Sequence, residues 1–386
     1  QDHPRSNMRW TAGVVVVFLA WCLSPAIFAP QLAPDLKGQI AIITGGSRGV
    51  GRGFAFGLSE AGATVYVTGR NQTSLREACA LAPGPGKCIP RVVDNGNDTS
   101  LESFFGDVIK ETNGRLDILV NNAYSAMAYW DRNGLLGKPF WNTPMELFDQ
   151  VHHIGVRSHY LATRLAIPVM LKQGRPGLVV NTNSPGCLSY VFNVPYGMGK
   201  CSIDKMTGDM AMELGGGTGI DVVSWWAGAP TQTDEIAGGT VDHLRPRRGT
   251  SPGLESVPNF STLFHTALAS TLLYEGRSLA ALARDPRRGR HSGLAVQSQQ
   301  NARAHGVRDE RGIHSPNFFS VKAQLTLWIP PLLRFARIAN PPSLAGPPTL
   351  SAAQHLYFNV LPDLNIPQWA LKLIGGPPLT FPWPIS

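Results

Sequence analysis

A tyrosine and a lysine stand four residues apart at Tyr196 and Lys200, in a stretch that predicts a helix from Tyr196 to about Leu214. On a helix, this spacing places both side chains on one face. A phenol ordinarily titrates near 10, but a neighbouring ammonium favours the phenolate and lowers the pKa. Lowering it by about three units requires about 4 kcal/mol of differential stabilisation. The pair therefore predicts a tyrosine that acts as a general acid or base.

Ser184 precedes Tyr196 by twelve residues and follows an apolar segment, 178–182, that is typical of a buried strand. A hydroxyl at the end of that strand can lie beside the phenol and donate a hydrogen bond to a carbonyl oxygen as charge develops there. Pro195 suits the start of the helix that carries the tyrosine. Tyr-x-x-x-Lys alone is common on helix surfaces, so the catalytic prediction depends on Ser184, Tyr196 and Lys200 together.

A glycine-rich turn lies between a predicted strand at 39–44 and a predicted helix that ends near Ala61. Glycines let the backbone turn tightly and approach a pyrophosphate, which binds the N–H groups of a helix N-terminus. A plain strand–helix turn is the alternative. The placement favours a dinucleotide site that includes Gly45, Ser47, Arg48, Gly49, Val50 and Gly51.

The choice of dinucleotide depends on the end of the second predicted strand, 64–68. An NAD site usually carries Asp or Glu there, whereas an arginine accommodates a 2′-phosphate. Gly69 occupies that position, Arg70 follows it, and Arg48 lies in the glycine turn. Two guanidinium groups near one phosphate favour NADP(H), although either arginine by itself could be an ordinary solvated side chain.

Short apolar segments alternate with helix-like stretches from Gly38 onward. Parallel neighbours need crossover connections, so this alternation predicts an α/β fold with a doubly wound, mostly parallel sheet of the Rossmann type. The predicted helices include one at about 145–172 and one near 262–283. The predicted strands are 39–44, 64–68, 88–93, 116–120, 178–182, 220–225 and 292–297.

Three segments are expected along the chain: an N-terminal hydrophobic segment at 1–35, a Rossmann-type domain at 36–315 and a C-terminal extension at 316–386. The domain includes a substrate loop at 229–290. Arg5 and Arg9 precede the apolar run, which suits a signal peptide or a short membrane anchor. We therefore expect the protein to associate with the membrane of the endoplasmic reticulum. The alternative is a cytoplasmic protein.

Basic residues are concentrated in one stretch, where 241–312 holds eleven arginines against six acidic residues. A nucleic-acid site would interleave aromatic residues with its arginines, but the clusters at 245–248 and 287–290 contain none, so a solvated loop is the better interpretation. The five cysteines form no Cys-x-x-Cys pair and leave one over. Reduced thiols are therefore expected, with no zinc or other metal site.

Three motifs in this order resemble those of the short-chain dehydrogenase/reductases: Thr-Gly-x-x-x-Gly-x-Gly at 44–51, Asn-Asn-Ala at 121–123 and Tyr-Gly-Met-Gly-Lys at 196–200. The resemblance implies NADPH-dependent reduction of a ketone or aldehyde, with Tyr196 as proton donor and steroid-like or xenobiotic carbonyls as substrates. It also implies that Tyr196 and Lys200 contact the cofactor, and that the protein can pair as a homodimer.

The resemblance assigns three further cofactor contacts. Asp94 resembles an adenine-contacting acid, although a loop-capping Asp is nearly as good an interpretation. Asn121 resembles a residue that lines the cofactor pocket, or else stabilises the sheet. Thr233 resembles a contact to the nicotinamide carboxamide if one residue is inserted, with Thr231 as the fallback.

Besides Tyr124, where many members have glycine, the chain departs from the family pattern at two places. Gly155 stands where many members have an asparagine that organises a water-linked proton path to the lysine, and His152 and His153 are possible substitutes. The usual Pro-Gly after the sixth strand reads Ala227-Gly228. These departures keep open the alternative of a cofactor-binding scaffold or pseudoenzyme with little turnover.

Overall fold

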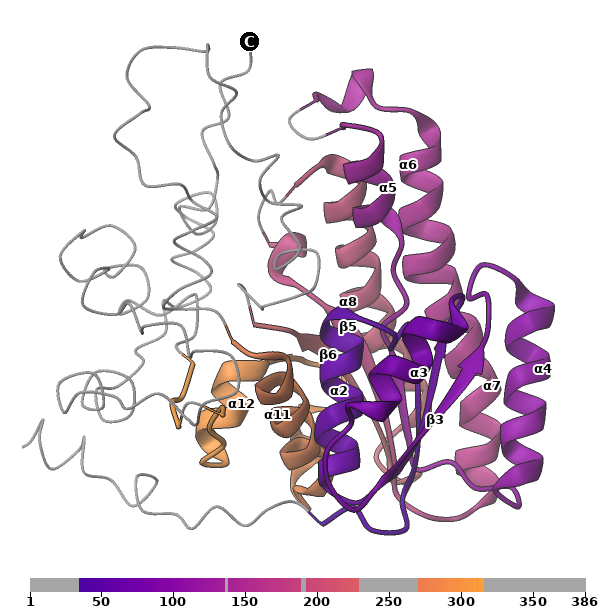
Figure 1. Cartoon of the computed structure of the whole chain (residues 1–386), viewed down its shortest axis with the longest axis vertical. Helices are drawn as coiled ribbons and strands as arrows, with labels where there is room; N and C mark the ends of the chain where they lie inside the picture. The colour runs from indigo at the N-terminus through magenta and orange to yellow at the C-terminus, as the bar shows by residue number, and fades with distance from the viewer. Residues whose placement is uncertain (1–34, 136–137, 189–191, 229–269, 311, 316–386) are drawn as a thin grey trace, which may run out of the picture.

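A seven-stranded sheet with the order β3-β2-β1-β4-β5-β6-β7 forms the centre of the computed structural model, and all its neighbouring strands are parallel (Figure 1). The structure describes residues 35–135, 138–188, 192–228, 270–310 and 312–315. The predicted doubly wound α/β fold is therefore confirmed. The strands are β1 (Ile40–Ile43), β2 (Thr64–Gly69), β3 (Lys87–Val92), β4 (Ile118–Asn121), β5 (Gly177–Asn183), β6 (Ile220–Trp226) and β7 (Ala295–Gln297).

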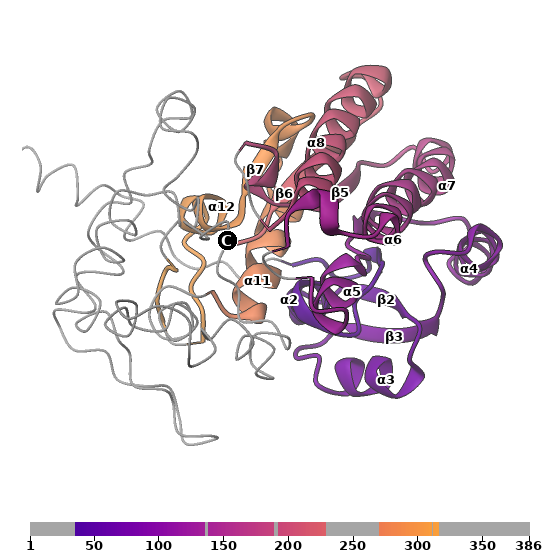
Figure 2. The same ribbon diagram turned by 90° about the horizontal axis from the view of Figure 1, so that it is seen from above.

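Helices cover both faces of the sheet, because successive strand residues point to opposite sides and both sides are apolar (Figure 2). Ile43 and Val65 face a core that α2, α3 and α11 close, while Ile42 and Tyr66 face a core closed by α4, α7 and α8. The helices are α2 (Gly49–Glu60), α3 (Gln72–Ala80), α4 (Asp98–Glu111), α5 (Ala126–Arg132), α6 (Met145–Asp149), α7 (Ser158–Lys172), α8 (Val194–Leu214), α11 (Leu272–Arg284) and α12 (Ser298–Ala304).

The helix predicted at 145–172 is interrupted in the structure. A π-helical stretch, η3 (Gln150–Arg157), separates α6 from α7. π-helical turns are uncommon and occur often at functional sites. This π-helical stretch contains Gly155. The irregular helix therefore lies at the position where the resemblance leads one to expect an asparagine.

The last predicted strand is shorter than expected. It was expected at 292–297, but β7 covers only Ala295–Gln297. The preceding residues turn instead: Ser292 N–H donates to the Gly289 carbonyl, and the Ser292 hydroxyl accepts from Val222 N–H. Val222 of β6 thus donates to a side chain and not to a strand carbonyl, and the regular ladder with β6 begins only at Ala295.

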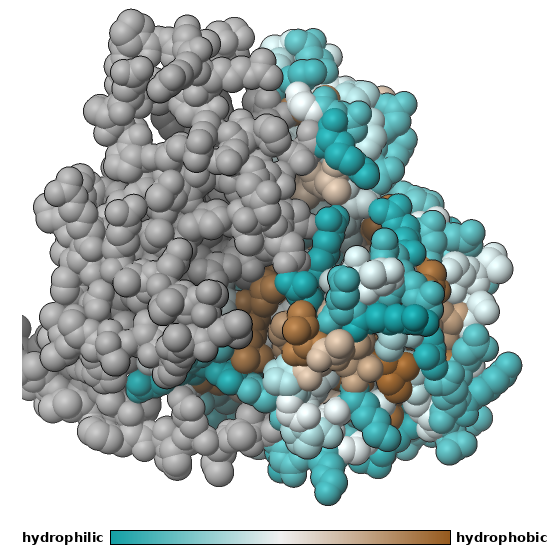
Figure 3. All heavy atoms as spheres, viewed as in Figure 1, coloured by the Kyte–Doolittle hydropathy of each residue, from teal (hydrophilic) through white to brown (hydrophobic). Residues whose placement is uncertain are grey.

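The surface of the described part is mostly polar in the view of Figure 3, with hydrophobic side chains gathered near the middle of the molecule. Within the described residues, no helix is long and apolar enough to cross a membrane. The predicted N-terminal segment and the C-terminal extension lie almost wholly outside these residues.

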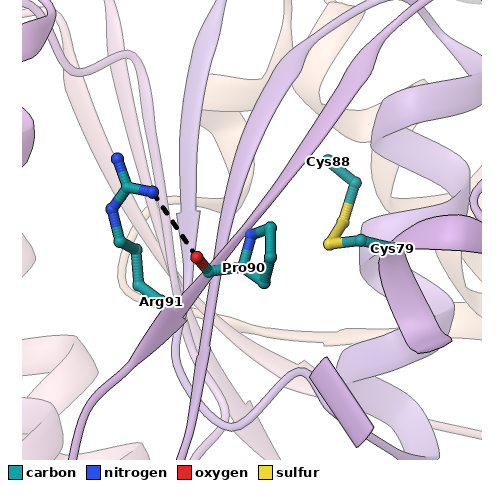
Figure 4. Close-up of a disulfide and its surroundings, with 4 residues drawn as sticks. All are labelled: Cys79, Cys88, Pro90 and Arg91. Atoms are coloured by element: carbon teal, nitrogen blue, oxygen red, sulfur yellow. Dashed lines mark hydrogen bonds between the residues drawn. A yellow bond between two sulfur atoms is a disulfide. The ribbon is translucent and has the colours of Figure 1, made fainter. Parts of the chain in front are cut away.

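Two cysteines form a disulfide, which corrects the expectation of reduced thiols. Cys79 lies near the end of α3 and Cys88 lies on β3 (Figure 4). A short loop connects these elements, and the two Cα atoms are 5.0 Å apart. Counting cysteines along the sequence could not show this, because the proximity arises from the packing of α3 beside β3. Cys187 and Cys201 are free thiols, and Cys22 lies outside the described residues.

Reduction of the Cys79–Cys88 bond is expected to lower the free energy of unfolding by roughly 2–3 kcal/mol, because the bond closes a short loop in the unfolded chain. Denaturant unfolding with and without dithiothreitol measures the change. The control is the Cys79→Ser/Cys88→Ser double variant, whose stability should not respond to the reductant. A wild-type midpoint that is equally insensitive would contradict a bond in solution.

Candidate active site

The N-terminus of α8 fixes the position of Tyr196. The Asn193 side chain accepts a hydrogen bond of 2.9 Å from Tyr196 N–H and so caps the helix. The helix begins at Val194, two residues earlier than predicted, with Pro195 in its first turn. Tyr196 is thereby placed in the first turn, with only 8% of its surface exposed.

The hydroxyls of Ser184 and Tyr196 lie 2.7 Å apart and share a hydrogen bond. Ser184 directly follows β5, as the sequence predicts, and begins the turn η4 (Pro185–Cys187). Gly186 permits the close approach, because a Cβ there would lie 2.7 Å from a carbon of the Tyr196 ring. The two hydroxyls therefore meet at the carboxyl end of β5, the edge of a parallel sheet where ligands bind.

Lys200 lies one helical turn after Tyr196, with its Nζ 5.4 Å from the centroid of the tyrosine ring. The same Nζ lies 4.8 Å from the ring centroid of Tyr124, which follows β4. The structure thus brings Ser184, Tyr196 and Lys200 together from two elements, and adds Tyr124 as a neighbour that the sequence singled out only as a departure from the family pattern.

The burial of Tyr196 corrects the expectation of a lowered pKa. Burial raises the pKa of Tyr196 to about 12, and the hydrogen bond with Ser184 lowers it only in part. The ammonium of Lys200 faces the ring of Tyr196, and burial lowers the Lys200 pKa to about 8 against the opposing effect of Asp204. A phenol that keeps its proton at neutral pH suits a proton donor.

Asp204, one turn beyond Lys200, anchors α8 to the sheet. Its carboxylate accepts hydrogen bonds from Asn183 Nδ2 at 2.7 Å and from Trp226 Nε1 at 3.2 Å. The Ser224 hydroxyl donates to the same oxygen. Sequence reasoning missed Asp204, although its spacing of four residues from Lys200 places it on the same helix face.

The glycine turn leaves no room for side chains. A Cβ at Gly45 would lie 2.7 Å from Ala123 Cα, and one at Gly51 would lie 2.3 Å from Asn122 Nδ2. Gly45 and Gly49 also have positive φ, of 66° and 57°. The turn therefore requires glycine and brings backbone without side chains to the start of α2, which fits a dinucleotide pyrophosphate.

Asn122 ties this turn to the loop after β4. Its Nδ2 donates to the carbonyls of Thr44 at 3.2 Å and Gly45 at 2.8 Å. In return, the Thr44 hydroxyl accepts from the backbone N–H groups of Asn122 and Ala123. The sequence assigned Asn122 no separate role, although it lies within the Asn-Asn-Ala motif.

The end of β2 lies against the same turn. A Cβ at Gly69 would lie 3.3 Å from Ser47 Oγ, so Ser47 and the residues after β2 share one corner. Arg48 occupies the N-cap position of α2, but its side chain makes no capping hydrogen bond. Both Arg48 and Arg70 are exposed. Val50 is half-buried and packs against the core, so its backbone contact with a cofactor stays a prediction.

Asp94 shows the loop-capping arrangement. Its carboxylate accepts from Gly96 N–H at 2.9 Å, and its own N–H donates to Ser100 Oγ at 3.1 Å. The adjacent Asn95 is buried and donates weakly to Thr68 Oγ1 at 3.5 Å. The adenine contact that the family resemblance assigns to Asp94 stays a prediction.

Asn121 is fully buried inside the sheet. Its Nδ2 donates to Thr163 Oγ1 at 2.8 Å and to Asn181 Oδ1 at 2.9 Å, which joins β4 to α7 and β5. This arrangement fits the sheet-stabilising alternative for Asn121, and its contact with the cofactor stays a prediction. Thr233 and Thr231 lie outside the described residues.

Among the described residues, both proposed substitutes for the missing asparagine bond to backbone carbonyls away from Tyr196 and Lys200. His152 Nδ1 bonds to the Phe148 carbonyl at 3.0 Å, and His153 Nε2 bonds to the Gly96 carbonyl at 2.8 Å. A third histidine, His159, lies one turn after Gly155 and is 3% exposed. The helix period places it on the inward face, a signal that the sequence analysis did not use.

His159 is a neutral imidazole near the lysine. Burial and then the charge of Lys200 lower its pKa to about 3. Its Nε2 lies 3.1 Å from the Ala123 carbonyl, which can only accept, so Nε2 carries the proton and Nδ1 is an acceptor.

Arg288 and Arg290, in the described part of the arginine-rich stretch, form ion pairs within the protein. Arg288 donates to Asp221 at 2.9 Å, and Arg290 pairs with Asp285 at 3.4 Å. Arg288 is therefore structural and not a solvated loop residue, which corrects that interpretation at this position. Among the described residues, no group of three or more His, Cys, Asp or Glu is arranged to hold a metal ion.

Comparisons with known proteins agree with this geometry. The family profile described as short chain dehydrogenase matches residues 39–236. Human dehydrogenase/reductase SDR family member 1 is 37% identical over 298 residues, which cover 76% of this chain and 90% of the relative. The 7alpha-hydroxysteroid dehydrogenase of Clostridium sardiniense is 30% identical over 46% of this chain and 66% of its own length.

A solved 7 alpha-hydroxysteroid dehydrogenase, complexed with NADH and 7-oxo glycochenodeoxycholic acid, has the same fold. It superposes with a TM-score of 0.54, covering 69% of this chain and 94% of the other, at 24% identity. At that identity the likeness concerns the arrangement of the chain and not its substrate.

Proposed function

The chain belongs to the short-chain dehydrogenase/reductase family and is an oxidoreductase, and we propose that it reduces ketones or aldehydes with NADPH. The observation that carries the proposal is the 2.7 Å contact between the Ser184 and Tyr196 hydroxyls. It lies at the carboxyl edge of the sheet, which also carries the glycine turn after β1. A carbonyl oxygen held by both hydroxyls receives two hydrogen bonds as it becomes an alkoxide.

The proton route follows from the pKa directions. Reduced nicotinamide, when bound, supplies a hydride to the carbonyl carbon. Tyr196 then donates its proton to the carbonyl oxygen, Ser184 holds that oxygen by a hydrogen bond, and Lys200 stabilises the phenolate that forms. Because burial raises the Tyr196 pKa to about 12, the phenol is protonated at neutral pH, as reduction requires.

The surroundings of Tyr196 support an apolar carbonyl substrate, steroid-like or xenobiotic. The Phe192 ring lies 5.0 Å from that of Tyr196 and 5.5 Å from that of Trp130. Phe192 is 42% exposed, so an aromatic surface borders the phenol. Flat hydrophobic molecules bind well against such rings, and one of the relatives named above is a hydroxysteroid dehydrogenase.

The direct test follows NADPH absorbance with a panel of steroid ketones, quinones and aromatic aldehydes. We expect turnover with at least one apolar ketone and weak turnover with small polar aldehydes. NADPH binding without turnover across the panel would favour the alternative, a cofactor-binding scaffold of the same fold.

Replacing Arg48 and Arg70 by alanine is expected to raise KM for NADPH about ten-fold for each arginine, while KM for NADH changes little. The physical reason is the loss of charge-assisted contacts to the 2′-phosphate, which NADH lacks. Steady-state kinetics with both dinucleotides measures the ratio. The exposed Arg76 on α3 provides the control as Arg76→Ala, and equal effects on both cofactors would contradict a 2′-phosphate site.

We further propose that the protein is membrane-associated through its N-terminal apolar segment, at the endoplasmic reticulum, and that it forms a homodimer. Retention in the membrane fraction after a carbonate wash, lost on deletion of residues 1–34, tests the membrane association.

Light scattering of the purified protein tests the homodimer, and a monomer mass at micromolar concentration would contradict it.

A further inference from the structure

Gly155 faces an aromatic ring that takes up the space of a side chain at this position. A Cβ on Gly155 would lie 2.8 Å from both Cδ2 and Cε2 of Tyr124. Such a distance is too short for carbon atoms, so the ring and any residue larger than glycine exclude each other. Gly155 lies in the π-helical η3, and Tyr124 belongs to the loop after β4. The departures from the family pattern at Gly155 and Tyr124 are therefore one structural feature.

The same Tyr124 ring contacts the catalytic pair. Lys200 Nζ lies over it, 4.8 Å from the centroid, and its plane meets the Tyr196 ring edge-on at 87° with centroids 6.2 Å apart. An aromatic face attracts an ammonium through its quadrupole, more strongly where water is excluded. The Tyr124 hydroxyl is buried and has no hydrogen-bond partner among the described residues. The contact therefore belongs to the ring face and not to the hydroxyl.

We propose that Tyr124 is a positioning residue for Lys200, and that its ring holds the ammonium in place of the asparagine that Gly155 replaces. The inference rests on the proposed function, since it concerns the lysine that stabilises the Tyr196 phenolate. Tyr124 acts through Lys200 and, in this arrangement, does not itself transfer a proton.

Other groups that face Lys200 do not supply this contact. Asp204 favours the charged lysine from the next turn of α8, but its carboxylate is already engaged with the sheet. His159 approaches from α7 as a neutral imidazole bonded to the Ala123 carbonyl. Tyr196, on the lysine's own helix, presents its ring at the longer distance of 5.4 Å.

Two substitutions at residue 124 separate the ring from the hydroxyl. Tyr124→Phe keeps the ring and should retain kcat and the wild-type pH profile. Tyr124→Leu removes the ring, so the charged lysine loses stabilisation and the Lys200 pKa, about 8 in the wild type, falls. Reduction needs the ammonium, so the alkaline fall of kcat/KM should move down by about one pH unit, with kcat about ten-fold lower.

A swap toward the family pattern tests the shared space. Gly155→Asn alone should lower Tm by about 5 °C, because the new side chain collides with the ring. Tyr124→Gly alone should also lose stability through the cavity that it leaves. The double variant Tyr124→Gly/Gly155→Asn should be more stable and more active than either single variant.

Matched controls exist for both changes. Gly106→Asn on α4 should leave Tm and kcat nearly unchanged, since a Cβ there meets nothing within 4 Å. Tyr160→Leu on α7 removes a tyrosine that is 54% exposed and should leave the pH profile unchanged.

The outcomes distinguish this inference from the proposed function. A wild type without turnover overturns the proposed function, while the Tm cycle still measures whether Tyr124 and Gly155 share space. An active wild type whose pH profile is unchanged in Tyr124→Leu overturns the role of the ring. A double variant no better than the singles overturns the exchange with asparagine. If Tyr124→Leu does not fold, the double variant's pH profile decides: a wild-type-like alkaline limb supports the exchange, and its loss overturns it.

Discussion

Tyr196→Phe should lower kcat for carbonyl reduction by about 10²–10⁴-fold, the range of positioned proton transfer. The substitution deletes the hydroxyl that lies 2.7 Å from Ser184 Oγ and leaves the ring contacts intact. Because burial raises the Tyr196 pKa to about 12, the wild-type phenol stays protonated across the neutral range. The measurement is steady-state NADPH oxidation with the best ketone of the panel, together with NADPH binding by fluorescence.

NADPH affinity should change by less than about three-fold in Tyr196→Phe, since the main hold on the dinucleotide is the glycine turn and the start of α2. Tyr129→Phe, on the neighbouring helix α5, is the matched control and should keep full activity. Ser184→Ala should lose less activity than Tyr196→Phe, because a hydrogen bond to the oxygen is lost but the proton donor remains. Full activity in Tyr196→Phe would show that another group donates the proton.

Gly57→Ala should lower the free energy of unfolding by about 3 kcal/mol, at the upper end of the effect of overpacking. Helices α2 and α11 approach backbone to backbone, so a Cβ on Gly57 would lie 1.9 Å from the carbonyl carbon of Gly276. Gly276→Ala should act similarly, since its Cβ would lie 1.9 Å from the Gly53 carbonyl oxygen. No side-chain rotation relieves a clash with backbone, so the two helices must separate. Urea unfolding measures the loss.

Gly106→Ala is the matched control for the same chemical change. Gly106 lies in α4, where an added Cβ meets nothing within 4 Å, so alanine should stabilise the helix by about 0.5–1 kcal/mol. Opposite signs at positions 57 and 106 would show that space, and not helix propensity, decides the outcome. A neutral Gly57→Ala would mean that α2 and α11 are further apart in solution.

The fold and most of the catalytic group could be predicted because they depend on local patterns. Apolar segments such as Ile40–Ile43 predict buried strands. The glycine turn can be identified because its residues are contiguous in the sequence. The spacing of Tyr196 and Lys200 fixes their common helix face. Ser184 follows a predicted strand, and parallel strands end at one edge of the sheet, so even this contact between separate elements was foreseeable.

Other parts of the site depend on residues that are distant in sequence. The Cys79–Cys88 bond needs α3 packed beside β3, which a count of cysteines cannot reveal. The raised Tyr196 pKa results from burial, and burial is a property of the packed site. The position of the His159 side chain near Lys200 depends on the packing of α7 against the loop after β4.

The sequence by itself determined the α/β class, the dinucleotide turn and the Ser–Tyr–Lys group, because hydrophobic periodicity and short spacings act within one or two elements. Tertiary structure alone decided that the Tyr124 ring fills the space beside Gly155 and faces Lys200. Two separate departures from a pattern become one contact only when a loop and a helix, about thirty residues apart, exclude each other from the same volume. Close packing of the interior is the physical reason, since atoms cannot share space and voids are costly.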